Sequence, residues 1–157
     1  MNSKLSPLFP VEITTSRVQT GARILLGAFL LLAGISHLTF ARGDFKAQVP
    51  DWLPMDMDLV VVLSGMAEIL LGSSLIFMRR HKAQVGLIAA IFFVCVFPGN
   101  ISQYIGHKNA FGLDTDKARF IRLFFQPVLI AWALWSSGAW RNYFQYSRKR
   151  RARGEAL

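Results

Sequence analysis

The chain has 157 residues, a length that suits one domain, and 53% of them are hydrophobic. That share is too high for an ordinary soluble domain of this size. The single cysteine, Cys95, excludes an internal disulfide and a CxxC redox pair. The sequence has no HExxH, Walker A or GxSxG signature, and its three histidines lie too far apart to predict a metal site.

Four long apolar stretches account for the excess of hydrophobic residues. We predict membrane-spanning helices at residues 21–40, 59–78, 83–104 and 119–140, because about 20 apolar residues in a helix cross about 30 Å of hydrocarbon. None of them has the polar stripe that a soluble helix of this length carries. The predicted fold is an all-α, polytopic membrane four-helix bundle over residues 20–140, with a polar segment at 1–19 and a polybasic tail at 141–157.

The net charge of +9 would suit a nucleic-acid partner, but the position of the cations favours membrane topology instead. Arg79, Arg80 and Lys82 lie in the short link between the second and third stretches, whereas the first loop is rich in aspartate. Lys and Arg gather in the loops that stay in the cytoplasm. Both termini are therefore predicted to be cytoplasmic, in a multi-pass protein without a nucleic-acid partner.

The tail after the fourth stretch contains the run RKRRAR. We expect it to contact anionic lipid, at about 1 kcal/mol per charge near the surface. The cations concerned are Arg148, Lys149, Arg150, Arg151 and Arg153.

Glu68 lies near the middle of the second stretch and is the leading candidate for a functional residue. A carboxylate at that depth costs roughly 2.5–3.5 kcal/mol, so it should face protein or water rather than lipid. Ser64, Gly65 and Gly72 share its helix face. Such small residues let a second helix approach closely, and we predict that a partner helix packs on this face.

Polar residues in the other three stretches are expected to gather near Glu68 in the outer half of the bundle. His37 is either an interfacial histidine or a proton carrier, and Asn100 either bonds a neighbouring helix or contacts a ligand. Arg122 and Gln126 share a face of the fourth helix, and Arg122 is within reach of an ion pair with Glu68. The five residues predict either a polar pocket open to the outer side or a buried network that fixes helix register.

The loop between the first two stretches contains VPDWLP at residues 49–54. Pro50 and Pro54 prevent a continuing helix, and Trp52 suits the headgroup region. The segment is an interfacial anchor or a lid over the predicted pocket, and its composition favours the anchor. Farther along, Asp114 or Thr115 is expected to cap a helix that begins near Asp116.

Several motifs in this order resemble the DoxX-like family of small bacterial four-span membrane proteins. They are RILLGAFLLLAG at residues 23–34 with His37 after it, VPDWLP, SGMAEILLG at 64–72, FPGNI at 97–101 and RLFFQPVLIAWALW at 122–135. The resemblance implies a four-helix bundle in the bacterial inner membrane. It leaves the function open, although the family takes its name from a subunit associated with thiosulfate:quinone oxidation.

Three functions are compatible with these features, and whether the protein is an enzyme stays open. The first is a small accessory subunit that binds another membrane protein or a second copy of itself. The second is a quinone- or thiosulfate-linked oxidoreductase subunit in which Glu68 and His37 handle protons and Arg122 holds an anion or a quinone oxygen. The third is a binder or carrier of a small lipophilic molecule. No cofactor motif is recognisable, and a quinone is the cofactor compatible with these features.

Overall fold

The computed structural model describes residues 13–152, with side chains described up to residue 145. All the secondary structure in this part of the chain is helical. The helices are α1 (Arg17–Leu38), α2 (Arg42–Lys46), α3 (Met57–Phe77), α4 (Lys82–Ile105), α5 (Asp116–Ser137) and α6 (Ala139–Ala152).

Four of these helices, α1, α3, α4 and α5, are long and apolar enough to cross a membrane. Their large apolar side chains face outward to an extent that water would not tolerate: Leu32, Leu70 and Val128 are 69%, 66% and 60% exposed. Four apolar helices with such a surface suggest a multi-pass membrane protein.

The ends of the long helices follow from local capping. Ser16 and the side chain of Gln19 form a capping box, so α1 begins at Arg17, before the predicted start at 21. Thr115 accepts a hydrogen bond from the Ala118 amide and caps α5 as predicted. Gly138 adopts the left-handed conformation with φ of 75° and ends α5 at Ser137, short of the predicted end at 140.

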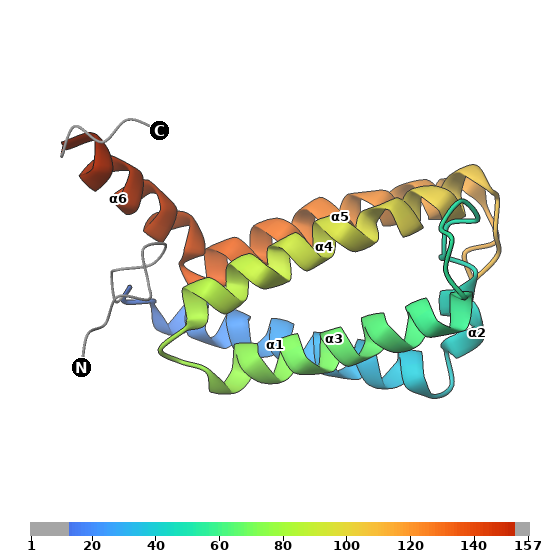
Figure 1. The fold of residues 1–157 in the computed structure, drawn as a ribbon, viewed down its shortest axis with the longest axis horizontal. Coiled ribbons are helices and arrows are strands. Elements are labelled where there is room, and N and C mark those ends of the chain that lie inside the picture. The colour runs from blue at the N-terminus through green and yellow to red at the C-terminus, as the bar shows by residue number, and fades with distance from the viewer. Residues whose placement is uncertain (1–12, 153–157) are drawn as a thin grey trace.

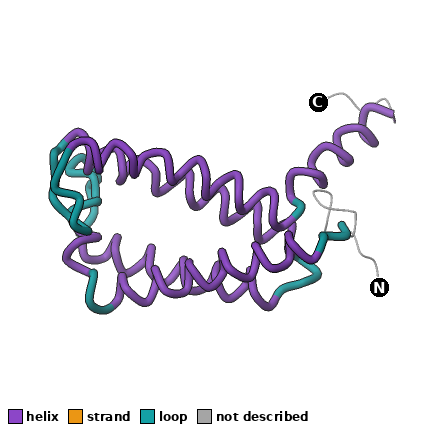
Figure 2. Tube along the Cα trace, turned by 180° about the vertical axis from the view of Figure 1, so that it is seen from behind, coloured by secondary structure: helices purple, strands orange, loops and turns teal. Residues whose placement is uncertain are grey.

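The long helices form two pairs, with α1 against α3 and α4 against α5 (Figure 1). The start of α1, the turn between α3 and α4 and the end of α5 lie at one end of the bundle, which we call the terminal end. The opposite end, called the loop end, holds α2 and the two longest loops, as Figure 2 shows. From the terminal end α6 leads away from the bundle.

Glycines allow α1 and α3 to touch backbone to backbone. A Cβ atom on Gly34 would lie 2.6 Å from the Gly65 carbonyl oxygen, and one on Gly72 would lie 2.6 Å from the Gly27 carbonyl oxygen. Gly65 and Gly72 belong to the stripe of small residues around Glu68. The predicted close approach of a second helix to this stripe is therefore confirmed, and the second helix is α1.

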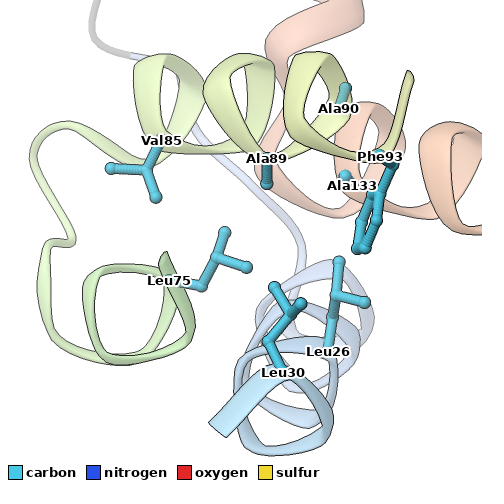
Figure 3. Packing of buried hydrophobic residues seen from close by; sticks show 8 residues of the cluster. All are labelled: Leu26, Leu30, Leu75, Val85, Ala89, Ala90, Phe93 and Ala133. Atoms are coloured by element: carbon cyan, nitrogen blue, oxygen red, sulfur yellow. The ribbon is translucent and has the colours of Figure 1, made fainter. Parts of the chain in front are cut away.

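The apolar core lies toward the terminal end and takes side chains from all four long helices (Figure 3). Leu26 and Leu30 of α1 meet Leu75 of α3, with Phe93 of α4 and Ala133 of α5 beside them. The core does not extend to the loop end, where buried polar side chains lie between the helices instead.

Candidate functional site

Glu68 of α3 and His37 of α1 form a buried pair at the loop end of the α1–α3 contact. Their residues are 9% and 5% exposed, and Glu68 Oε2 lies 2.8 Å from His37 Nδ1. The same ring nitrogen lies 3.0 Å from the Ala33 carbonyl oxygen and hydrogen-bonds to it, whereas Glu68 Oε2 is buried without a hydrogen-bond partner among the described residues. Gly65 makes room for this arrangement, since a Cβ there would lie 2.7 Å from His37 Cβ.

Aromatic rings from the two loops cover the pair. The Phe45 ring stacks on His37 with centroids 3.3 Å apart, and Phe111 meets Phe45 edge-on at 4.6 Å. Phe45 is part of α2, which Asp58 fastens to the start of α3 by ion pairs with Arg42 and Lys46. The hydrogen bond from Arg42 to Asp58 raises the pKa of Arg42 above its ordinary value.

Arg122 also lies at the loop end, on α5 of the other helix pair. Its guanidinium carbon lies 5.4 Å from the centre of the Phe111 ring, within the range of a cation–π contact. With its amide oxygen turned toward Arg122, Gln48 accepts hydrogen bonds from Arg122 Nη2 and Nε at 3.2 Å and 3.3 Å. Glu68 therefore pairs with His37 rather than with Arg122. Arg122 and Glu68 attract each other only at longer range.

Amide side chains connect the loop to α4 and α5. The Gln48 amide lies 2.9 Å from that of Gln103 and 3.4 Å from Asn100 Oδ1. Asn100 Nδ2 donates to Gln126 Oε1 at 3.0 Å, and Gln126 Nε2 donates to the Phe93 carbonyl at 2.6 Å. Gly99 admits the loop backbone, because a Cβ there would lie 2.9 Å from the Gln48 carbonyl oxygen.

The five residues singled out by the sequence therefore form two groups that share the loop end. His37 and Glu68 touch in one group, and Asn100 and Gln126 touch in the other. Arg122 joins the second group through Gln48 rather than by an ion pair with Glu68. We refer to these residues together with Gln48, Gln103, Phe45 and Phe111 as the polar cluster.

Four members of the polar cluster were missed as site residues. Gln103 lies on α4 beside the predicted Asn100, whereas Gln48, Phe45 and Phe111 lie in loops or the short α2. Helical periodicity says nothing about where such residues point. The motif FPGNI held a usable signal, since a glycine beside the buried Asn100 marks a place where another backbone can approach.

The VPDWLP segment lies at the edge of this cluster. Pro50 is buried, whereas Trp52 is 71% exposed and Pro54 is exposed. Lys108 holds the segment by contacts to the Asp51 carboxylate at 2.8 Å and the Val49 carbonyl at 3.4 Å. These placements are compatible with an interfacial anchor, which stays a prediction.

The basic tail cannot be placed at the level of side chains. Arg148, Lys149, Arg150 and Arg151 belong to the backbone of α6, but their side chains lie outside the described part, and Arg153 lies outside the described residues altogether.

Two pockets lie away from the polar cluster, at the terminal end. One of about 650 Å³ is lined by residues of α1, α5 and α6, and the other, of about 380 Å³, by residues of α3 and α4. The predicted pocket over Glu68 stays a prediction. Within residues 13–152 no three His, Cys, Asp or Glu side chains are placed to hold a metal ion.

Fold and site together define a class of protein: a helical bundle with four candidate membrane spans and ionisable side chains collected at one end. A family model described as a domain of unknown function, DUF8561, matches residues 26–137, and the chain belongs to that family. The match runs from α1 to the last residue of α5 and so includes the whole polar cluster. No curated protein and no solved structure matches the chain.

Proposed function

We propose that the protein is a small accessory subunit of a membrane complex, and that its polar cluster binds a lipophilic molecule that carries acceptor oxygens. A quinone is the best candidate for that molecule. The observation that carries the proposal is the arrangement of Glu68, His37 and Arg122, three ionisable side chains at one end of helices that lipid surrounds. Such residues are costly in a membrane and mark functional sites.

Arg122 supplies the main argument for a ligand. A guanidinium has five N–H donors, and among the described residues Arg122 contacts only an amide and an aromatic ring. Neither contact neutralises its charge. A ligand oxygen beside Arg122 would use the remaining donors.

The surroundings of Arg122 favour a planar ligand with oxygens at both edges. Phe45 and Phe111 offer aromatic faces between Arg122 and the His37–Glu68 pair. One ligand oxygen would then face the guanidinium and the other the imidazole. A quinone has this shape and an apolar tail that suits lipid.

We also propose an orientation for the molecule, with the loop end outside and both termini in the cytoplasm of a bacterial inner membrane. The terminal end carries Arg79, Arg80 and Arg141, while Asp51 and Asp56 lie at the loop end. Cytoplasmic loops carry an excess of Lys and Arg, so this distribution favours a cytoplasmic terminal end. The resemblance to the DoxX-like family supports the same membrane.

A ligand at the polar cluster can be tested by native mass spectrometry of the protein released from mild detergent. We expect a discrete small-molecule adduct on the wild type that is lost in both Glu68→Gln and Arg122→Gln. Lys117→Gln is the matched control, because Lys117 is an exposed cation on the same helix as Arg122. Identical spectra for all four proteins would contradict the proposal.

A quinone-linked oxidoreductase subunit is the second candidate, favoured by the 2.8 Å contact of Glu68 with His37. Imidazole and carboxylate groups are the side chains that most often act as general acids and bases in enzymes. In this case Glu68→Gln would abolish a quinone-dependent activity of the membrane while the protein level stays unchanged. Ligand binding without any loss of turnover would favour the accessory subunit.

A further inference from the structure

Arg23 is a buried cation that has no hydrogen-bond or ion-pair partner among the described residues, and it lies at the opposite end of the bundle from the polar cluster. The residue is 2% exposed, and its Nε and Nη1 atoms are buried without any hydrogen-bond acceptor. It lies on the inward face of α1, one turn before Gly27. Nothing in the ligand proposal for the loop end uses this residue.

No described carboxylate is available to neutralise Arg23. Within residues 13–152 the aspartates all lie at the loop end, and Glu68 is in contact with His37. The charge of Arg79 acts on Arg23 and repels it. Arg23 is therefore buried beside a like charge.

A guanidinium cannot escape this situation by losing its proton in the ordinary pH range. A buried charge is tolerated when it is paired and hydrogen-bonded, and an unpaired one strongly destabilises the fold. The fork of N–H groups on arginine matches the two oxygens of a phosphate or carboxylate. An oxyanion is thus the chemistry that would complete the Arg23 site.

A cavity at the same end offers room for the rest of such a ligand. Its volume is about 650 Å³ and its lining includes Gln19, which precedes Arg23 by one turn on the same face of α1. Arg23 is not itself part of the lining, but side chains on a helix lean toward its N-terminus, which favours an approach of Arg23 to the turn of Gln19. The cavity combines an apolar wall from Leu134, Trp135 and Trp140 with polar groups from Ser16 and Arg141.

We propose that Arg23 anchors an oxyanion of the phosphate class at the terminal end of the bundle. The oxyanion is the headgroup of an anionic lipid, whose chains would lie in the adjoining cavity, or a free phosphate. The site is separate from the polar cluster, and the ligand proposed there has no part in it.

The test measures the midpoint of thermal unfolding of the delipidated full-length protein in a neutral detergent. Three probes are compared: inorganic phosphate, mixed micelles with phosphatidylglycerol and mixed micelles with zwitterionic phosphatidylcholine. At saturation we expect phosphatidylglycerol to raise the midpoint by about 5–10 °C, with phosphatidylcholine giving no rise. An equal rise with inorganic phosphate would identify a free oxyanion as the ligand, and no rise with phosphate would identify the lipid.

Arg23→Met provides the decisive variant. It removes the unpaired charge and keeps an unbranched side chain, so we expect an unfolding midpoint without ligand that equals or exceeds that of the wild type. The rise with the anionic probe should be lost. Arg80→Met, which removes an exposed cation at the same end, should keep the rise.

Two results would overturn the proposal. One is an anion-dependent rise of the same size in Arg23→Met and the wild type, which would place the anion elsewhere. The other is the absence of a rise in the wild type with both phosphatidylglycerol and inorganic phosphate. A lower midpoint in Glu12→Gln or Glu155→Gln would then mean that the chain supplies its own counter-ion.

Discussion

The two ends of the bundle are held together by different interactions. Toward the terminal end Leu26, Leu30 and Leu75 form part of an apolar core, whereas at the loop end Gln126, Asn100 and Gln48 lie between the helices. Lipid is as apolar as leucine, so the first kind of contact depends on close packing rather than on exclusion of water. The second kind is specific, because an amide in hydrocarbon has no other partner.

This difference predicts that the largest single effect comes from the loop end. His37→Leu leaves Glu68 buried without its partner, and we expect a loss of about 3–5 kcal/mol in the free energy of unfolding. The double variant His37→Leu/Glu68→Leu should recover most of that loss. Denaturant unfolding in detergent measures both. Equal stability of the single and double variants would show that the pair contributes nothing as a pair.

The packing of α1 on α3 should be the next most sensitive feature. In Gly34→Ala the new Cβ would meet the Gly65 carbonyl oxygen at 2.6 Å, and we expect a loss of about 1–3 kcal/mol from overpacking. Gly21→Ala is the matched control on the same helix, because its Cβ would meet nothing within 4 Å. That variant should gain up to about 1 kcal/mol from helix propensity. The same unfolding assay separates the two glycines by the sign of the change.

A smaller effect is expected for the amide network. Gln126→Leu removes one hydrogen bond to Asn100 and one to the Phe93 carbonyl. We expect a loss of about 1–2 kcal/mol in the free energy of unfolding. Such bonds are worth roughly 0.6 kcal/mol each in membranes, and breaking them leaves unsatisfied groups. A double-mutant cycle with Asn100→Leu should give a coupling energy above experimental error. Strict additivity of the two changes would contradict the contact.

The smallest effect should come from the apolar core. Leu30→Met conserves volume, and we expect a loss below about 1.5 kcal/mol despite the 1% exposure of Leu30. Thermal unfolding of Leu30→Met and Gln126→Leu under the same conditions compares the two losses of stability directly. If the core variant proved the more damaging of the two, the contrast between the ends would be wrong.

Much of this arrangement could be predicted from helical periodicity. Length and hydropathy indicated four long helices, and the spacing of Gly65, Glu68 and Gly72 indicated that α3 would have a close neighbour. Periodicity also placed Arg122 and Gln126 on one face. It could not identify the partner of Arg122, because helix rotation and loop conformation decide whether a guanidinium meets a carboxylate or Gln48.

The end of the fourth span was harder to predict, because Ala139 and Trp140 continue the apolar run after the helix has stopped. The decisive residue is Gly138, whose left-handed backbone other residues rarely adopt. Ser136 and Ser137, which precede Gly138, were the signal in the sequence that the helix ends there. The DoxX-like resemblance, the bacterial membrane and the orientation of the termini remain predictions.

The pairing of α1 with α3 and of α4 with α5 has a consequence for how the protein is made. Each pair consists of membrane helices that follow one another in the chain, and the α1–α3 contact is complete before α4 begins. Contacts that are local in sequence form early, and chains assemble in the order in which they are synthesised. The first hairpin can therefore close in the membrane while the second is still being translated, and the contact between the Gln48 and Gln103 amides belongs to the final docking of the two halves.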